Sequence, residues 1–327
     1  MTIGILGGGV WGSALGKLFS DQKVLIYTRN KKTMDSINDH HFNPKLKYAI
    51  FNDNVRATDN LEEISKKNII FIALPSQNIR EVLSKSYFSN INADIIIASK
   101  GIEISSSLFL SQIISDLTKP VSLSILSGPC FSDEVAQDLP TAATFASLNT
   151  SIFDRVSNML NKKRFRIYYS DDIIGCQIGG ALKNIYAIAA GISDGLNLGE
   201  NARSALITRS FVEISRFATF FKSKKETIFG LSGLGDLMLT CNSSKSRNTN
   251  FGIKISNIKN SNFEKELNKK AITEGFYTTK AAMKIASKNN IEMPILESVF
   301  NILYNEFNIE EEINKLMSRP LTIENIS

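Results

Sequence analysis

The chain begins with a short apolar run that leads straight into a glycine-rich turn, and this feature limits the possible folds more than any other. Ile3–Leu6 has the composition of a buried β-strand, and the six residues that follow read GGGVWG. Gly7, Gly9 and Gly12 therefore have the spacing G-x-G-x-x-G. The first permits a tight turn, the second lets a pyrophosphate approach the backbone, and the third lets helix and strand pack closely. Because a helix N-terminus also attracts phosphate, the segment predicts a dinucleotide site; the alternative is a glycine-rich turn without a ligand.

Strand-like and helix-like segments alternate through the first half of the chain. Short runs rich in Ile, Val, Leu and Phe predict further strands over Lys23–Tyr27, Asn68–Leu74, Asp94–Ser99 and Val121–Ser127. Near-continuous apolar strands are typical of a parallel sheet covered by helices on both faces. Helical patterns lie between them, for example at Trp11–Ser20 and Ser76–Leu83. The alternation predicts an α/β Rossmann domain, doubly wound around a mainly parallel sheet.

The pattern changes near Asp171. Beyond it, helical patterns dominate over Asp172–Ile192, Ala202–Phe221, Thr279–Lys288 and Leu296–Glu306. A length of 327 residues also fits two domains. We therefore predict a dinucleotide-binding domain over residues 1–171 and an all-α domain over residues 172–327.

The residues after the second predicted strand bear on the choice of cofactor. An NAD site usually has Asp or Glu there to hold the ribose 2′-hydroxyl, whereas this chain has Thr28-Arg29-Asn30. An arginine in this place can accept a 2′-phosphate, so NADP is favoured over NAD. The alternative is that Arg29 stacks on adenine or faces solvent.

Composition argues against several other classes of protein. The net charge of +6 suits small anionic ligands, but the basic residues form small scattered groups without interleaved aromatics, so nucleic-acid binding is not expected. Three widely spaced cysteines without a CxxC pair predict neither a disulfide framework nor a metal site. The N-terminus lacks a signal-peptide pattern, and no uninterrupted apolar run reaches the length of a membrane span. We expect a cytoplasmic protein without membrane insertion.

Lys183 is the strongest candidate for acid–base chemistry. It lies in a helical pattern whose other residues are mostly apolar or small, and Gly179 and Gly180 share its face one turn earlier. A glycine pair weakens a helix, so it indicates close approach by backbone or ligand. The alternative is a lysine that reaches solvent from a buried helix. The two histidines, His40 and His41, are adjacent in a polar, loop-like segment and are poor candidates.

Other polar residues follow predicted strands or share a predicted helix face. Asp236 and Thr240 share one face, and Arg247 offers a planar donor group suited to phosphate. The alternative is a capped helix followed by a solvated loop. Lys100 and Gly128 follow strands, where ligands bind in open α/β sheets, although Lys100 fits a surface loop equally well.

Taken in order, the motifs resemble those of one enzyme family. They read GGGVWGSAL, SKGIE, SGPCFSDE, LPTA, IGGALKNIYAIAAGISDGL, NARSALITR, GLSGLGDLMLTC, SRNTNFG, EG and MP. This set resembles the bacterial NAD(P)-dependent glycerol-3-phosphate dehydrogenases from the N-terminus to beyond residue 300. The KN pair in the glycine-flanked helix, and GLGDL…TC followed by SRN, are the most specific parts.

The resemblance implies a Rossmann domain, a helical domain like that of 6-phosphogluconate dehydrogenases, and reduction of dihydroxyacetone phosphate to sn-glycerol 3-phosphate. It implies that Lys183 donates or accepts the proton, and we expect Asp236 and Asn184 to keep Lys183 oriented and charged. The implied substrate contacts are Lys100, Gly128, Cys130, Lys183, Asp236, Ser246, Arg247 and Asn248. Besides the three motif glycines, the implied cofactor contacts are Val10, Trp11, Arg29, Lys100, Ser132, Arg247, Ile272 and Glu274. It also implies a cytoplasmic homodimer that supplies phospholipid synthesis.

Two residues depart from the family pattern. Cys130 stands where the family usually has Thr or Ser and would bond a substrate more weakly, and Ser132 stands where Ala is frequent. Two other functions stay open at this point: a related two-domain dehydrogenase of another hydroxy or sugar acid, and a non-enzymatic NAD(P) sensor.

Overall fold

The computed structural model describes residues 1–258, 273–321, 323 and 324, and it divides into two compact units. The first unit comprises Met1–Ser99 and Leu110–Ile173, and the second comprises Lys100–Phe109 and Ile174–Ser327. The domains over residues 1–171 and 172–327 stay a prediction, and in the structure Lys100–Phe109 is part of the second unit. This segment joins the second unit because Ile102 and Phe109 are buried in the core of that unit.

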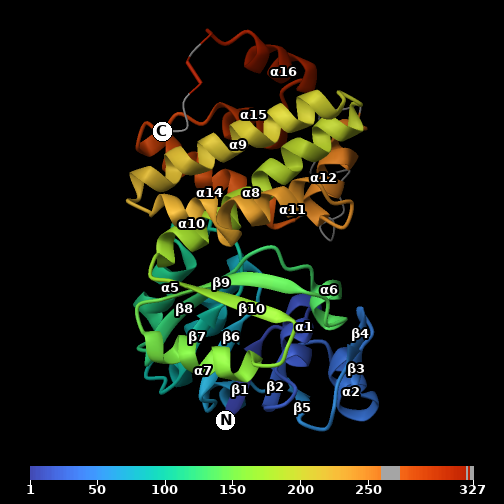
Figure 1. Ribbon diagram of the computed structural model, residues 1–327, viewed down its shortest axis with the longest axis vertical. Coiled ribbons are helices and arrows are strands. Elements are labelled where there is room, and N and C mark those ends of the chain that lie inside the picture. The colour runs from blue at the N-terminus through green and yellow to red at the C-terminus, as the bar shows by residue number, and fades with distance from the viewer. Residues whose placement is uncertain (259–272, 322, 325–327) are drawn as a thin grey trace. The chain divides into compact units, whose positions relative to one another are not determined.

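The first unit is built on an eight-stranded sheet in the order β10-β9-β8-β7-β6-β1-β2-β5. Its strands are β1 (Thr2–Leu6), β2 (Lys23–Tyr27), β5 (Val55–Thr58), β6 (Ile69–Ile72), β7 (Asp94–Ile97), β8 (Ser122–Ser127), β9 (Thr141–Ser147) and β10 (Phe165–Ser170). Every neighbouring pair is parallel except β8–β9. The prediction of a doubly wound, mainly parallel sheet is therefore confirmed (Figure 1).

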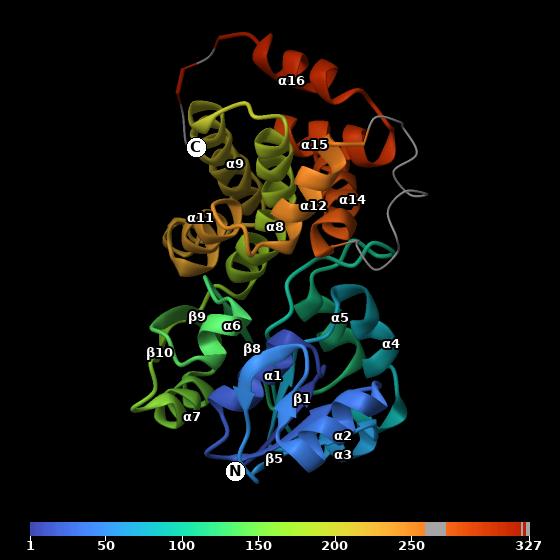
Figure 2. The same ribbon diagram turned by 90° about the vertical axis from the view of Figure 1, so that its right-hand side faces the viewer.

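Short helices connect the strands and lie on both sides of the sheet (Figures 1 and 2). They are α1 (Val10–Leu18), α2 (Lys31–His40), α3 (Leu61–Ser65), α4 (Ile79–Leu83), α5 (Leu110–Leu117), α6 (Ser132–Ala136) and α7 (Thr150–Leu160), with 3-10 turns at Ser76–Asn78 and Ser86–Phe88. A hairpin of β3 (Phe42–Asn43) and β4 (Leu46–Ile50) follows α2. The core between sheet and helices is aliphatic and aromatic, with Ile3, Ile5 and Phe71 fully buried.

Five strands of the eight-stranded sheet agree with the sequence prediction, and the other three were missed for identifiable reasons. β9 reads TAATFAS, whose alanines and threonines give little apolar signal. β10 lies at one edge of the sheet, where charged and exposed residues alternate with buried ones. β5, at the other edge, has only four residues. Exposed residues interrupt the buried ones in both edge strands, at Arg56 in β5 and at Arg166 and Tyr168 in β10, so neither has the continuous apolar run of a central strand.

In its described part the second unit is helical. Its elements are α8 (Ile173–Gly195), α9 (Glu200–Phe220), α10 (Lys225–Phe229), a π-helical turn η3 (Leu231–Gly235), α11 (Asp236–Cys241), α12 (Arg247–Ser256), α14 (Glu274–Lys288), α15 (Pro294–Tyr304) and α16 (Ile309–Met317). Helices α8, α9, α14 and α15 supply most of the apolar core. The prediction of an all-helical second domain is confirmed for these residues.

Helix α8 is buried on all sides because its glycines let other backbones approach. A Cβ on Gly191 would lie 2.0 Å from the Thr249 carbonyl oxygen of α12, and one on Gly179 would lie 2.3 Å from that of Ser232 in η3. Gly252 of α12 packs directly against Gly191, and a Cβ on Gly252 would lie 2.1 Å from the Ile188 carbonyl oxygen. The glycine signal of the sequence therefore marks close backbone packing, which places η3 and α12 directly against α8.

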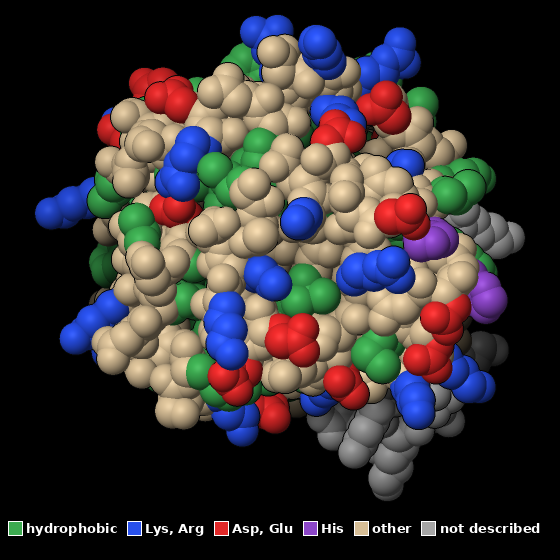
Figure 3. Space-filling view, turned by 90° about the horizontal axis from the view of Figure 1, so that it is seen from below, with side chains coloured by type: hydrophobic (Ala, Val, Ile, Leu, Met, Phe, Trp, Pro, Cys, Tyr) green, Lys and Arg blue, Asp and Glu red, His purple; other side chains and the backbone are tan. Residues whose placement is uncertain are grey.

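Within the described residues, α8 has the length and hydropathy of a membrane-spanning helix. Its mean hydropathy over 18 residues is 1.3, yet 89% of that window is buried inside the structure. Such burial is that of a core helix in a folded protein. On the face shown in Figure 3, basic side chains alternate with acidic and uncharged ones and form no continuous basic surface.

Candidate active site

A buried carboxylate on α11 brings two lysines together in the second unit. Asp236 is 1% exposed, and one of its carboxylate oxygens, Oδ1, accepts a hydrogen bond of 2.5 Å from Lys183 Nζ. Its other oxygen, Oδ2, lies 2.5 Å from Lys100 Nζ. Both lysine side chains are largely buried, with exposed fractions of 10% for Lys183 and 21% for Lys100. Contact between groups of opposite charge offsets part of the cost of burying each of them.

Thr240 completes this cluster on the same face of α11. Its hydroxyl oxygen accepts a hydrogen bond of 2.8 Å from Lys183 Nζ and donates to the Asp236 carbonyl oxygen at 2.6 Å. The spacing of four residues puts both acceptors one helical turn apart. Lys183 is thus held by a carboxylate and a hydroxyl, which fixes the direction of its ammonium group.

The start of α11 is set by the π-helical turn that precedes it. Gly233 has no room for a side chain, because a Cβ would lie 2.0 Å from the Ile228 carbonyl oxygen. The turn packs on α8 at Gly179, one turn before Lys183. Single π-helical turns are frequent at functional sites because they shift the register of a helix. Here the turn brings Asp236 to Lys183.

A second polar group lies where α12 begins. Asn248 donates to Asn184 Oδ1 at 3.0 Å and accepts from the Gly275 backbone N–H at 3.0 Å, so it links α12 to α8 and α14. Ser246 caps α12 by accepting from the Thr249 N–H at 3.2 Å. Arg247 is exposed and makes no hydrogen bond or ion pair with the described residues. A helix N-terminus with an arginine beside it is suited to a phosphate.

Arg203 of α9 supports this arrangement and was not predicted. Its guanidinium donates to the Cys241 carbonyl oxygen at the end of α11 and lies 3.0 Å from the Asp194 carboxylate. The residues NARSALITR belong to the family resemblance, but their pattern does not show which of them contacts α11. Burial raises the pKa of the Cys241 thiol to about 12, so this cysteine stays a thiol and is no nucleophile.

In the first unit, the three motif glycines have the geometry of a phosphate-binding turn. Gly7 has a φ of +123°, and a Cβ there would lie 2.4 Å from the Ala73 carbonyl oxygen. A Cβ on Gly12 would lie 1.8 Å from the Gly7 carbonyl oxygen, which explains the glycine at the start of α1. A Cβ on Gly9, by contrast, would have no described atom within 4 Å. The backbone is therefore open where a pyrophosphate would approach.

The neighbouring candidates surround this turn. Val10 is the first residue of α1, and the Trp11 indole donates to the Ala98 carbonyl oxygen at 3.0 Å. Arg29 follows β2 and is exposed, while Asn30 caps α2 by accepting from the Thr33 N–H at 2.9 Å. No acidic residue ends β2.

The remaining candidates divide between the two units. Gly128, Cys130 and Ser132 lie after β8 in the first unit, with the Cys130 thiol 3.9 Å from the Ala142 carbonyl oxygen. Glu274 is the first residue of α14 in the second unit. Ile272 lies outside the described residues.

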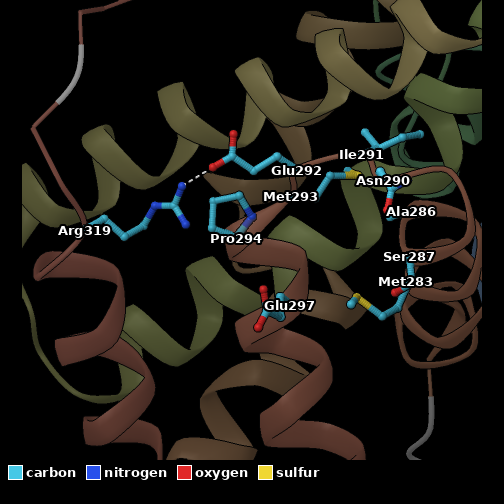
Figure 4. A pocket seen from close by; sticks show the side chains of 10 residues that line it. All are labelled: Met283, Ala286, Ser287, Asn290, Ile291, Glu292, Met293, Pro294, Glu297 and Arg319. Atoms are coloured by element: carbon cyan, nitrogen blue, oxygen red, sulfur yellow. Dashed lines mark hydrogen bonds and ion pairs between the residues drawn. The ribbon is translucent and has the colours of Figure 1, made fainter.

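The described residues also form a surface pocket of about 330 Å³ away from these groups, shown in Figure 4. It is lined by the end of α14, the turn to α15, and Arg319, which is paired with Glu292. It contains none of the candidate residues. Among the described residues no group of His, Cys, Asp and Glu has the arrangement of a metal site.

Comparison with known proteins identifies the family. The N-terminal model of NAD-dependent glycerol-3-phosphate dehydrogenase matches residues 2–153, and the C-terminal model matches residues 172–314. The glycerol-3-phosphate dehydrogenase [NAD(P)+] of Zymomonas mobilis is 39% identical over 98% of this chain and 93% of its own length. That of Thermotoga sp. is also 39% identical, over 98% of both chains.

The chain belongs to the NAD(P)-dependent glycerol-3-phosphate dehydrogenase family. Among solved structures, the glycerol-3-phosphate dehydrogenase of Coxiella burnetii superimposes with a TM-score of 0.87 at 34% identity, covering 97% of this chain and 99% of that one. The resemblance inferred from the motifs is therefore confirmed, together with the two-domain fold and NAD or NADP as the cofactor.

More distant dehydrogenases share only the architecture. D-mandelate dehydrogenase superimposes with a TM-score of 0.60 at 14% identity, which shows a common fold and carries no information on substrate. Membership of the glycerol-3-phosphate dehydrogenase family sets aside the alternative of another hydroxy-acid dehydrogenase.

Proposed function

We propose that this member of the family reduces dihydroxyacetone phosphate with Lys183 as the proton donor. The observation that carries the proposal is the buried Asp236 carboxylate, which holds Lys183 at 2.5 Å together with the Thr240 hydroxyl at 2.8 Å. A side chain fixed in this way can deliver a proton to one defined atom, as general acid catalysis requires.

The reaction needs a hydride on C2 of the ketone and a proton on the oxygen of C2. When bound, the reduced nicotinamide supplies the hydride. Lys183 Nζ gives its proton to the oxygen as the C=O bond becomes a C–O–H group, and the resulting neutral amine regains a proton from solvent. In the reverse direction Lys183 accepts the proton. Lys100 adds a second positive charge, which stabilises the negative charge that develops on the oxygen.

The substrate phosphate is held in this proposal by the start of α12. Arg247 supplies a planar pair of donors, and the backbone N–H groups of Arg247 and Asn248 lie at the N-terminus of the helix, beside the Thr249 N–H that Ser246 caps. Gly128 and Cys130 contribute further substrate contacts, with the Cys130 thiol a weaker partner than a hydroxyl.

The cofactor is held by the turn over Gly7–Gly12. The open backbone at Gly9 and the N-terminus of α1, which no described side chain caps, fit a pyrophosphate. Arg29 favours NADP through the 2′-phosphate. The remaining cofactor contacts in the proposal are Val10, Trp11, Lys100, Ser132, Arg247, Ile272 and Glu274.

A spectrophotometric assay tests the reaction. Purified protein should oxidise NADPH in the presence of dihydroxyacetone phosphate, and more slowly oxidise NADH. Dihydroxyacetone without the phosphate should be a poor substrate, because the contacts at α12 are lost. Folded protein that binds NADPH but turns over hydroxy-acid or sugar-acid ketones in preference to the phosphate ester would contradict the proposal, and binding without turnover would indicate a sensor.

The proposal also includes a cytoplasmic homodimer that supplies phospholipid synthesis. These properties are supported by the family resemblance alone. Light scattering coupled to gel filtration measures the mass directly, and a value of one chain mass, 36.3 kDa, would contradict the dimer.

A further inference from the structure

Asn43 is a fully buried polar side chain that no sequence motif singles out. It ends the short strand β3 and is 0% exposed. Its amide nitrogen donates to the Gly8 carbonyl oxygen at 3.2 Å and to Ser13 Oγ at 2.7 Å. Its amide oxygen accepts from the Lys45 N–H at 2.9 Å. A buried asparagine with both amide hydrogens used in this way fixes its neighbours, because leaving either donor unpaired is costly.

These partners belong to the glycine-rich turn and to the first turns of α1. Three consecutive glycines lose more conformational entropy on folding than any other three residues, so the turn needs support from outside itself. On one side Gly8 is pressed against Thr28, since a Cβ there would lie 2.5 Å from the Thr28 Cβ. Asn43 holds the carbonyl of the same residue. Gly8 is therefore clamped between the end of β2 and the hairpin.

The clamp sets the direction of the next N–H group. In a planar trans peptide the carbonyl and the following N–H point in opposite directions. With the Gly8 carbonyl on Asn43, the Gly9 N–H must point away from Asn43. Gly9 is also the residue whose Cβ position is open. One hydrogen bond thus orients the peptide that a pyrophosphate would meet.

The hairpin that carries Asn43 is itself firmly attached. Leu46 and Ala49 of β4 are buried in the core of the first unit, and β4 contacts α1 (Figure 1). The Ser36 hydroxyl donates to the Phe42 carbonyl oxygen at 2.9 Å, which ties the hairpin to α2. The hairpin that carries Asn43 is therefore held in place by α1 and α2.

We propose that Asn43 is a positioning residue for the cofactor, acting through the Gly8 carbonyl to hold the phosphate-binding turn in its binding conformation. The inference rests on the proposed cofactor site at Gly7–Gly12. Loss of Asn43 should change the affinity for the cofactor and not the chemical step, because Asn43 lies in the first unit and Lys183 in the second.

The test compares Asn43→Ala with Asn38→Ala. Asn38 is a matched control in the same unit: its amide donates to the Ala57 carbonyl oxygen at 3.0 Å and accepts from the Ala57 N–H at 2.8 Å, on an edge strand away from the turn. Trp11, the single tryptophan of the chain, is the second residue of α1, so quenching of its fluorescence can be used to measure NADPH binding.

Asn43→Ala should raise the Kd for NADPH about tenfold, since the loss of one buried hydrogen bond changes an equilibrium constant by roughly this factor. The KM for NADPH should rise in parallel, whereas kcat at saturating NADPH and the KM for dihydroxyacetone phosphate should stay within about twofold of wild type. Asn38→Ala should leave all four constants unchanged. If Asn43→Ala does not fold, Asn43→Asp keeps the volume and removes the donors, with the same expected outcome.

An unchanged NADPH Kd in the folded Asn43 variant would overturn the inference. Equal weakening by the Asn38 variant would also overturn it, because it would show a general loss of stability. Absence of NADPH binding by the wild-type protein is a different result, since it would refute the cofactor site itself.

Discussion

Lys183 is the residue whose loss should affect chemistry most. Lys183→Ala removes the proton donor, so kcat should fall by about 10²–10⁴-fold, while the Kd for NADPH stays near the wild-type value. Steady-state kinetics measure kcat, and Trp11 quenching measures the Kd for NADPH. Lys315→Ala is a suitable control, because Lys315 is an exposed lysine paired with Glu297 at 2.8 Å on the surface. Near-normal turnover by a folded Lys183→Ala protein would exclude Lys183 as the proton donor.

Arg29 should decide between the two cofactors. Arg29→Ala removes a charged donor from the end of β2, so the KM for NADPH should rise by about tenfold or more while the KM for NADH changes little. Arg56→Ala, which removes another exposed arginine of the same unit, should affect neither. Equal losses with both cofactors would place Arg29 on the adenine rather than on a 2′-phosphate.

At the scale of elements, two glycines, Gly191 inside α8 and Gly9 before α1, have different roles. Gly191→Ala would force a Cβ to within 2.0 Å of the Thr249 carbonyl oxygen, separating α8 from α12. We expect a loss of about 1–3 kcal/mol in the free energy of unfolding, as for other overpacked cores, and lower activity. Gly9→Ala has space for its Cβ and should leave stability unchanged but weaken NADPH binding. Thermal unfolding measures the stability of the two variants, and Trp11 quenching measures their NADPH binding. Equal changes in stability and in NADPH affinity for both variants would contradict these separate roles.

At the scale of the whole molecule, one buried glutamate should make stability depend on pH. Glu213 of α9 accepts hydrogen bonds from the N–H groups of Ile295 and Leu296 at the start of α15 and from the Tyr186 hydroxyl of α8. Burial raises the pKa of Glu213 to about 7, although the backbone donors and Tyr186 oppose this rise. In the unfolded chain the same carboxyl has an ordinary pKa of about 4.3.

The Glu213 carboxyl binds its proton more tightly in the folded state than in the unfolded chain. Its contribution to the free energy of unfolding is therefore fully present at low pH and is lost as the pH rises through about 7. The change should be on the order of 3 kcal/mol across this range. In Glu213→Gln, which cannot titrate, this component should disappear. Denaturant unfolding of both proteins between pH 5 and 8 measures the difference, and identical pH profiles would show that Glu213 does not titrate there.

Much of the fold was predictable, and several candidate site residues could be selected, because their sequence signals are local. Lys23–Tyr27 was predicted with the bounds of β2, since a strand covered on both faces is apolar along most of its length. Glycine spacing predicted the turn over Gly7–Gly12, because only glycine tolerates the close backbone contacts at Gly7 and Gly12. Lys183 was selectable because a lysine in an apolar helix is unusual. The edge strands β5 and β10, and the alanine-rich strand β9, carried weaker local signals and were missed.

Tertiary structure alone decided which distant residues meet. Lys100 and Lys183 contact the two oxygens of Asp236 across separations of more than fifty residues, through the packing of η3 on Gly179 and of Ile102 and Phe109 into the core of the second unit. Asn43 reaches Gly8 only because its hairpin folds back on α1. Local sequence determines which backbone conformations a segment can adopt. The partners of a buried polar group depend on how complete elements pack. The free energy of that packing comes from contacts spread over the whole core, so no short segment of sequence reveals it.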